Sequence, residues 1–313
     1  MHRTVEGGSS VLNRKKMLFL VNPHAGKAAI RGHLLSIVDI FSAAGYLVTL
    51  YTSQRADEIP EIVRACGEEY DIIVGSGGDG TMNEVINGVM GCPRKPILGY
   101  IPAGTTNDFA SSLHLPRNMV EAAQAVVSGA PTFFDVGSFN QSYFSYVAAF
   151  GAFTDVTYQT PQEYKNLLGK LAYLLEGAAR LPSLRPRHIR VEYDDGVVED
   201  DILLGIVTNS AFVAGLPVGR LIDTSMNDGV MEVFLVRNPN SILDVSPVVN
   251  KLIMGEIDRR SVHVLRTRKL KLVCDEAIPW TLDGEYGGDW KEANIENLCC
   301  ALRLMVPADS LEG

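Results

Sequence analysis

Apolar residues in the first 135 positions follow two patterns, one typical of buried strands and one typical of helices. Short apolar runs that end at turn signals predict buried strands; they cover 17–22, 46–53, 71–76, 96–104 and 132–139. Between them, apolar residues recur every three or four positions, which predicts helices over 30–41, 59–66, 81–90, 107–113 and 118–129. Gly45 follows the first helix as a C-cap. Because strands alternate with helices and are apolar on both faces, we expect a doubly wound α/β domain around a parallel sheet.

The alternation of predicted strands and helices ends near residue 136, and strand-like runs predominate after it. One predicted helix at 162–181 and another at roughly 241–256 interrupt a series of strand-like runs, with a hairpin signal at Asp195-Gly196. These runs are "RHIRVEYDDGVVEDDILLGIVTNS", "GVMEVFLVRN", "KLKLVCD", "WTLDGE" and "LCCALRLMVP". Antiparallel strands with hairpin turns predict a β-sandwich or barrel. We expect a disordered leader over 1–16, an α/β domain over 17–135 and an all-β domain over 136–313, whose last residues are free to return to the first domain.

Composition narrows the functional classes. The chain has 313 residues, which favours two domains, and a net charge of −9, which argues against a broad nucleic-acid-binding surface. Its five cysteines show no CxxC spacing and are odd in number, so they indicate core thiols of a reducing compartment and neither a disulfide framework nor a zinc site. The longest uncharged stretch, 136–154, contains polar residues that would not span a bilayer. We therefore expect a cytoplasmic protein whose membrane contact is peripheral.

The glycine-rich segment "GSGGDGT" (75–81) follows the third predicted strand. Ligands of open parallel sheets bind beyond the carboxyl ends of the strands, and glycines let consecutive N–H groups point at one phosphate. A dinucleotide-binding motif requires an acidic residue on the next strand, and this sequence has none there. A Walker A loop requires a lysine, which this segment also lacks. Asp79 would repel phosphates unless a cation intervenes, so the segment favours magnesium–nucleotide chemistry over a plain β–α turn.

Three further segments follow predicted strands: "NPHAG" (22–26), "PAGTTND" (102–108) and "FFDVG" (133–137). Because the carboxyl ends of parallel strands meet at one edge, we expect Asn22, Gly104, Asp108 and Asp135 to converge there with Asp79. This convergence carries more weight than any single motif.

These motifs, together with "WTLDGE" late in the chain, resemble those of the diacylglycerol kinase family of soluble bacterial lipid kinases. The resemblance covers the chain after about residue 17 and extends to sphingosine and ceramide kinases. It implies an N-terminal phosphofructokinase- and NAD-kinase-like α/β domain, a C-terminal β-sandwich on the lipid side of the cleft, and transfer of the γ-phosphate of ATP to a lipid hydroxyl, with Mg²⁺. Diacylglycerol is the family's usual acceptor and gives phosphatidic acid, although the sequence leaves the lipid open.

The resemblance also implies roles for individual residues. Glu285 matches the proton acceptor, and Asp79, Asp108 and Asp135 match an acidic network that positions magnesium and the reacting hydroxyl. We take Glu285 as the base and Asp79 as the water-mediated metal ligand, and the opposite assignment stays open. The residues that would hold ATP are Asn22, Pro23, His24, Ala25, Gly26, Thr52, Gly78, Asp79, Gly80, Thr81, Met82, Asn83, Glu84 and Thr105.

The segment 223–236 resembles the part of the family that carries a second, structural magnesium ion. Asp228 would ligate this ion by its side chain, and Ser225 and Val230 would ligate it by their carbonyl groups. Asp228-Gly229 is equally an ordinary turn before a strand, and this alternative stays open.

Membrane contact has two candidate segments. Residues 259–271 contain six basic residues and no acidic residue. Such a segment could bind anionic lipid, or it could be a solvated face of a strand, which is the interpretation that we favour. The helix at 162–181 could form a lid, although an apolar stripe is more often core. The resemblance leaves a homodimer through the β-sandwich open.

Two other functions compete with a lipid kinase. A soluble-substrate kinase, such as an NAD kinase, shares the GGDG segment but not "PAGTTNDFA". A nucleotide-sensing regulator would bind without turnover and would have no need to keep Asp79, Asp108 and Glu285 together.

Overall fold

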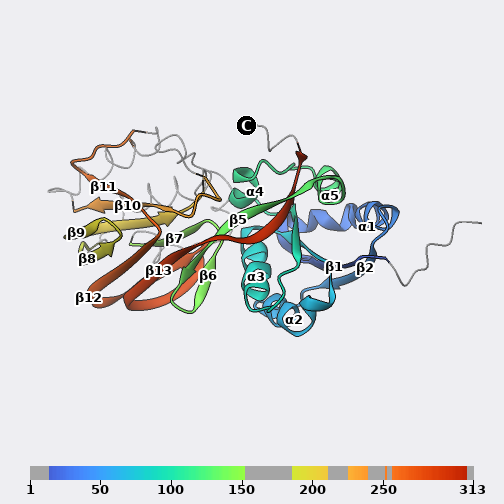
Figure 1. Ribbon diagram of the computed structural model, residues 1–313, viewed down its shortest axis with the longest axis horizontal. Coiled ribbons are helices and arrows are strands. Elements are labelled where there is room, and N and C mark those ends of the chain that lie inside the picture. Colours follow the sequence, from blue (N-terminus) through green and yellow to red (C-terminus); the bar gives the residue numbers. More distant parts are fainter. Residues whose placement is uncertain (1–13, 152–184, 211–224, 239–250, 252–255, 309–313) are drawn as a thin grey trace, which may run out of the picture.

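The computed structural model describes residues 14–151, 185–210, 225–238, 251 and 256–308 (Figure 1). The predicted helix at 162–181, almost all of the one at 241–256 and the leader up to residue 13 lie outside these ranges. Within the described residues, the strands form one sheet in the order β11-β10-β9-β7-β12-β13-β4-β3-β1-β2, with β5, β6 and β8 pairing beside this path.

The N-terminal half is the expected doubly wound α/β unit. Its four strands run parallel in the order β4-β3-β1-β2; they are β1 (Lys16–Val21), β2 (Leu47–Thr52), β3 (Ile72–Gly77) and β4 (Ile97–Pro102). The helical segments are η2 (Ala25–Gly32), α1 (Leu34–Ala43), α2 (Glu58–Cys66), η3 (Gly67–Glu69), α3 (Asp79–Met90), α4 (Asp108–Ser112) and α5 (Met119–Ser128).

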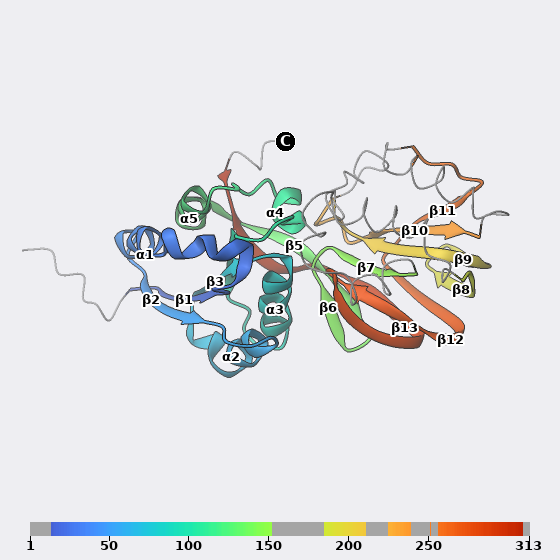
Figure 2. The ribbon, with the colours of Figure 1, turned by 180° about the vertical axis from the view of Figure 1, so that it is seen from behind.

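Alternation along β1 shows why both faces of this sheet are covered. Met17 and Phe19 pack with α1 and α5, whereas Leu18 and Leu20 pack with α2 and α3. Successive side chains of a strand point to opposite faces, so a strand between two helix layers must be apolar throughout. Figure 2 shows the two helix pairs on opposite sides of the strands.

The C-terminal half is built from antiparallel strands. They are β5 (Ala130–Phe139), β6 (Ser142–Phe144), β7 (Val147–Phe150), β8 (Arg187–Tyr193), β9 (Gly196–Thr208), β10 (Met231–Arg237), β11 (Val262–Thr267), β12 (Lys269–Leu282) and β13 (Glu285–Val306). Their core centres on Trp280, which is fully buried and lies 4.8 Å from the ring of Phe139 and 4.7 Å from that of Phe150.

Two long strands join the halves. β5 pairs along its whole length with the second half of β13, from Ile295 opposite Phe139 to Val306 opposite Ala130. Near its end β13 also lies parallel to β4, with Leu304 opposite Leu98. The red strand in Figure 1 therefore passes from the all-β half into the α/β half. One apolar cluster contains residues of both halves as a consequence.

Several elements differ from the sequence predictions. The third helix begins at Asp79 instead of residue 81. The run "KLKLVCD" and the first three residues of "WTLDGE" belong to the single strand β12, and the last residue of "WTLDGE" begins β13. The hairpin between β8 and β9 has Asp194 and Asp195 in its turn, because Tyr193 pairs with Gly196. Strands β6, β7 and β11 and the first half of β13 were missed.

No helix among the described residues is long and apolar enough to cross a membrane. All five cysteines are free thiols.

Candidate active site

A cavity of about 880 Å³ lies at the carboxyl ends of the parallel strands, against the β12–β13 turn. It brings together predicted residues from three loops of the α/β half and from the all-β half. They are Asn22, His24, Ala25, Gly26, Gly78, Asp79, Gly80, Thr81, Asn83, Glu84, Thr105 and Glu285. Residues that are far apart in the sequence therefore form one site, as expected from the strand ends.

Glycines let the three loops touch backbone to backbone. A Cβ atom on Gly26, which has φ +53°, would lie 1.8 Å from the carbonyl oxygen of Ala103. A Cβ on Gly104 would lie 2.5 Å from the Cα of Gly78. No other residue fits at either position without moving the loops. The glycines thus give this edge of the sheet a wall of bare backbone, which a phosphate chain can approach closely.

Asn22 fixes the first loop against the start of α3. Its amide Nδ2 donates to the hydroxyl of Thr81 at 3.2 Å, and its Oδ1 accepts from the backbone N–H of His24 at 3.0 Å. The backbone N–H of Asn22 itself donates to Ser76 at the end of β3. The "NPHAG" loop is therefore held at the N-terminus of α3, where the helix dipole favours negative charge.

Asn107 closes the third loop. It has φ +53°, its Oδ1 accepts from the backbone N–H of Gly104 at 2.9 Å, and its Nδ2 donates to the Gly104 carbonyl at 3.0 Å. Asn107 is a site residue that the sequence motifs did not single out. The residue type itself indicated such a turn position, because asparagine tolerates the left-handed region of backbone conformation and hydrogen-bonds to nearby backbone groups.

Asp79 is the first residue of α3 and is only 7% exposed. Its Oδ1 accepts from the backbone N–H of Phe109, in the first turn of α4, at 3.2 Å. Burial, followed by the charges of Asp79 and Asp108, raises the pKa of the Tyr100 phenol well above its ordinary value. Asp79 and Asp108 thus belong to one buried acidic region below the cavity.

Glu285 lies above the same helix start. A Cβ on Gly80 would be 3.3 Å from its Oε1, so the absent side chain of Gly80 makes room for the carboxylate. Glu285 is exposed and lines the cavity. The two candidate bases therefore both lie at the first turn of α3, and Asp79 is buried whereas Glu285 is exposed to the cavity.

Asp283 positions Glu285, and sequence reasoning missed it. Leu282 pairs with Glu285, so Asp283 and Gly284 form a two-residue turn in which both have positive φ. The Asp283 carboxylate accepts from five donors: Asn83 Nδ2 at 2.6 Å, Ser145 N at 2.6 Å, Ser145 Oγ at 2.7 Å, and Tyr146 N and Val147 N at 3.0 Å each. Burial nevertheless raises the pKa of Asp283. Asp-Gly is a strong signal for this turn.

Asn83 and Asn87 connect α3 to the all-β half. Asn83 reaches both Asp283 and the carbonyl of Tyr143, and Asn87 exchanges hydrogen bonds with the backbone of Tyr143 at 3.0 and 3.1 Å. The two asparagines are one turn apart on the same helix face. The helix that begins at Asp79 is therefore fastened to the turn that presents Glu285.

Some predicted site residues do not line the cavity. Met82 is fully buried beneath it, Asp108 is 2% exposed at the start of α4, and Thr52 accepts a hydrogen bond from the side chain of Gln54. Pro23 lies in the first loop but is not among the lining residues. The proposed roles of these four residues stay predictions.

The placement predicted for Asp135 is wrong. The residue lies within β5, which runs antiparallel to β13, and so does not stand at the carboxyl end of a parallel strand. Its carboxylate is fully buried and accepts from the backbone N–H groups of Cys300 at 2.7 Å and Gly229 at 2.8 Å and from Asn297 Nδ2 at 3.0 Å. Asp135 therefore supports the 225–230 loop, and it is not among the lining residues of the cavity.

The predicted second magnesium site lies in that loop. One carboxylate oxygen of Asp228 accepts from Val230 N at 3.1 Å, and the other pairs with Arg266 at 2.8 Å. The Val230 carbonyl accepts from Asn297 at 2.9 Å. The oxygen donors are present, but a metal ion at Asp228 would have to displace the Arg266 guanidinium. This site stays a prediction.

The first magnesium site was predicted at Asp79, Asp108 and Asp135. Asp79 lines the cavity together with Glu84 and Glu285, whereas Asp108 and Asp135 are not among its lining residues. Burial, and to a lesser degree the negative charges of Asp57 and Glu285, raises the pKa of Glu84. Carboxylates are the oxygen donors that a hard divalent cation prefers, and this site stays a prediction.

The comparisons with known proteins agree over nearly the whole chain. The family model described as "Diacylglycerol kinase catalytic domain" matches residues 16–139, and that described as "YegS C-terminal NAD kinase beta sandwich-like domain" matches residues 148–306. A diacylglycerol kinase of Bacillus subtilis is 34% identical and covers 95% of this chain and 98% of its own. One of Staphylococcus saprophyticus is 32% identical, with 95% and 97% covered.

Solved structures agree on the fold. A crystal structure from Bacillus anthracis covers 97% of this chain and 99% of its own, with a TM-score of 0.84 at 24% identity. A second structure from this organism, of a diacylglycerol kinase, has a TM-score of 0.75 at 22% identity and covers 95% and 99%. The α/β domain followed by a β-sandwich-like domain is therefore confirmed.

Proposed function

The chain belongs to the diacylglycerol kinase family and is a lipid kinase, and we propose that it transfers the γ-phosphate of ATP, with Mg²⁺, to the hydroxyl of diacylglycerol to give phosphatidic acid. The observation that carries this proposal is the meeting of bare glycine backbone, the start of α3 and the Glu285 carboxylate around one cavity. Phosphoryl transfer requires positioning and charge stabilisation more than covalent chemistry, and this arrangement suits both needs.

In the proposed reaction, the triphosphate binds along the loops at Gly26, Gly78 and Gly104. Backbone N–H groups and the N-terminal end of α3 stabilise its negative charge. Asn22 orients this surface through its hydrogen bonds to Thr81 and His24. When bound, Mg²⁺ would neutralise charge on the transferred phosphate, and Asp79 and Glu84 are the residues that would hold it, directly or through water.

Glu285 is the better candidate for the base that accepts the hydroxyl proton. Its carboxylate faces the cavity and its backbone is fixed by the Asp283 turn, whereas Asp79 is buried and already accepts from Phe109. A base must reach the reacting hydroxyl, so exposure to the cavity favours Glu285.

We also propose that the protein contacts an anionic bilayer transiently, since its acceptor is a lipid. The basic segment 259–271 is a weaker candidate than its composition suggests. Arg266, Arg268 and Lys271 form ion pairs with acidic residues of the same chain, which favours the interpretation as a solvated strand face. Co-sedimentation with vesicles that contain or lack anionic lipid would test the contact.

The kinase assay uses ATP labelled at the γ-phosphate, Mg²⁺ and detergent-dispersed diacylglycerol, with separation of the labelled lipids. We expect labelled phosphatidic acid that disappears when EDTA is added. A parallel reaction with a total lipid extract identifies the acceptor if diacylglycerol is not the preferred lipid. Labelling of NAD without any labelled lipid would contradict the proposal and favour the soluble-substrate alternative.

A further inference from the structure

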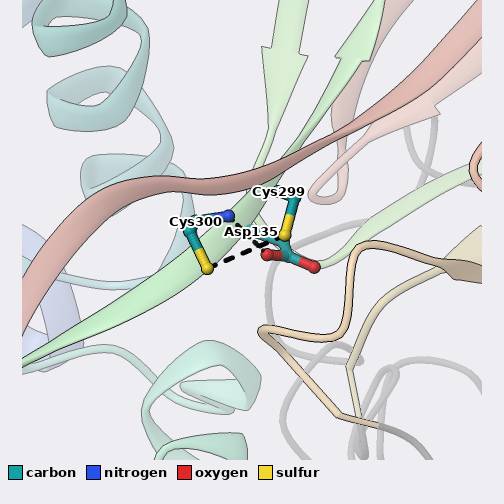
Figure 3. Close-up of side chains that lie close together, drawn as sticks. All are labelled: Asp135, Cys299 and Cys300. Carbon is teal, nitrogen blue, oxygen red and sulfur yellow. Dashed lines mark hydrogen bonds between the residues drawn. The ribbon is translucent and has the colours of Figure 1, made fainter.

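Two adjacent cysteines lie beside Asp135 where β13 crosses β5 (Figure 3). In a regular strand, neighbouring side chains point to opposite faces, which would separate the two thiols. Here the register between β13 and β5 shifts between Leu298 and Leu302, and Cys300 adopts φ +52°. This bulge brings the Sγ atoms of Cys299 and Cys300 to 3.7 Å from each other.

The carboxylate of Asp135 completes the cluster. An ionised carboxylate has about four positions for donors. Three are occupied by Cys300 N, Gly229 N and Asn297 Nδ2, and the Cys299 thiol lies at the fourth. One oxygen of this carboxylate and the two sulfur atoms all lie within 4.8 Å of one another. Figure 3 shows the three side chains facing the same point.

We propose that Cys299, Cys300 and Asp135 bind one thiophilic divalent cation of the zinc class. Zinc takes four ligands in a tetrahedron at about 2.3 Å from sulfur, which places two thiolates about 3.8 Å apart. The Sγ–Sγ distance of 3.7 Å matches that spacing. Two sulfur atoms and one carboxylate oxygen are a donor set that zinc accepts, and Cys299 is exposed, so that water can supply the fourth ligand.

The charge of the site also balances. Before binding, two thiols and one buried carboxylate carry a charge of about −1; the entering dication releases both thiol protons to solvent and leaves the charge unchanged. The site differs from the predicted magnesium sites because sulfur ligands select a softer ion. A bound ion would fasten β13 to β5 and to the 225–230 loop, since a Cβ on Gly229 would lie 3.2 Å from the Cys299 sulfur.

The test measures metal binding directly. The reduced full-length protein, stripped of metal, is titrated with Zn²⁺ in competition with a chromophoric chelator, and separately with Cd²⁺ to detect thiolate-to-cadmium charge transfer by its absorbance. We expect one ion per chain with a Kd of about 1 μM or lower, and a rise in the thermal unfolding temperature with added Zn²⁺.

Variants separate this site from the other thiols. Cys299→Ser and Cys300→Gly should each weaken binding at least about 100-fold and reduce the cadmium band. Cys300→Gly guards against a folding defect, because glycine accepts φ +52° without strain. Cys66→Ser, at the end of α2, is the matched control and should bind as the native protein does.

Asp135→Asn should lower the affinity while the cadmium band remains. The proposal is overturned if no ion binds, if binding occurs without charge transfer, or if Cys299→Ser and Cys300→Gly bind as tightly as the native protein.

Discussion

Asp283 shows how much of the site depends on a residue that need not touch the substrate. Its carboxylate gathers donors from α3 and from the Ser145–Val147 segment, and the turn that it stabilises presents Glu285 to the cavity. A buried carboxylate with five donors is stable only while those donors remain in place.

Replacing Asp283 by alanine should lower the free energy of unfolding by about 3–5 kcal/mol. The substitution leaves buried N–H groups of Ser145, Tyr146 and Val147 without an acceptor. Urea denaturation measures the loss. Asp275→Ala replaces an exposed acid of β12, the strand that leads into this turn; it is the control and should change the stability by about 0.5 kcal/mol or less. A small loss for Asp283→Ala would mean that the turn does not depend on this carboxylate.

Replacing Glu285 by glutamine should lower kcat by a factor of about 10²–10⁴, with little change in the KM for ATP. The amide keeps the shape of the side chain but cannot accept the proton. Steady-state kinetics measure the effect, and Glu276→Gln, an exposed glutamate of β12, is the control.

The pH–rate profile of Glu285→Gln distinguishes the two candidate bases. If Glu285 is the base, the acid limb of the profile is lost in the variant. An unchanged acid limb would assign the role to Asp79 instead.

At the residue scale, the sequence predicted the side chains that belong to contiguous motifs. Asn22 and Asp79 were found because each stands in a short pattern whose chemistry is local, and Glu285 was found because "WTLDGE" resembles a motif of the family. The structural role of Asn83 was not, because its partner Asp283 is 200 positions away in the chain. The periodicity and motif spacing of a single sequence cannot reveal a contact between residues so far apart in the chain.

Among the elements, the three glycine loops depend on contact between backbones. Gly104→Ala should raise the KM for ATP at least about tenfold and lower the thermal stability, because the new Cβ would lie 2.5 Å from the Cα of Gly78. Gly32→Ala is the matched control, since a Cβ there meets nothing within 4 Å. Nucleotide kinetics and thermal melting measure both variants. Equal KM values would show that the loops need not touch.

The β8–β9 hairpin should respond to pH through Asp194. A hydrogen bond from Arg268 N, and next one from the Thr267 hydroxyl, lower the pKa of Asp194 below 3.8. A carboxyl whose pKa is lowered on folding stabilises the protein above its unfolded pKa, and this contribution is lost as the pH falls through the folded pKa.

Asp194→Asn should therefore be less stable than the native protein at neutral pH, and the difference should shrink below a pH of about 3.8. Urea midpoints across the pH range measure it. Asp195→Asn, in the same turn, is the control. A difference that stays constant with pH would exclude this titration as its cause.

The elements that the sequence predicted well are those with uniform surroundings. Strands β1, β3 and β4 lie between two helix layers, so their apolar runs are unambiguous. The first half of β13, from Glu285, contains exposed polar residues and glycines, and nothing in its pattern separated it from a loop. This segment forms a strand because it pairs with β12, and its intrinsic β-propensity alone would not predict one.

For the whole molecule, one continuous sheet and a shared apolar cluster predict a single cooperative unfolding transition. Tryptophan fluorescence reports on Trp280 and Trp290 in the all-β half, and far-ultraviolet circular dichroism also reports on the helices of the α/β half. The two urea curves should coincide. Separate transitions would show that β5 and β13 do not couple the halves.

The fold class was predictable at this scale because the change from helical to alternating patterns is visible in the sequence. The sequence left open that the last residues of the chain return to the first domain, but it did not show that β13 pairs with strands of both halves. A strand that returns across about 200 residues leaves no local trace.

The long final strand also sets an order of events during synthesis. β4 obtains its partner Leu304 only after β13 has been synthesised and has left the ribosome, long after the glycine loops have been made. The catalytic half therefore cannot complete its sheet before β13 emerges, and the enzyme gains its phosphate-transferring shape only then.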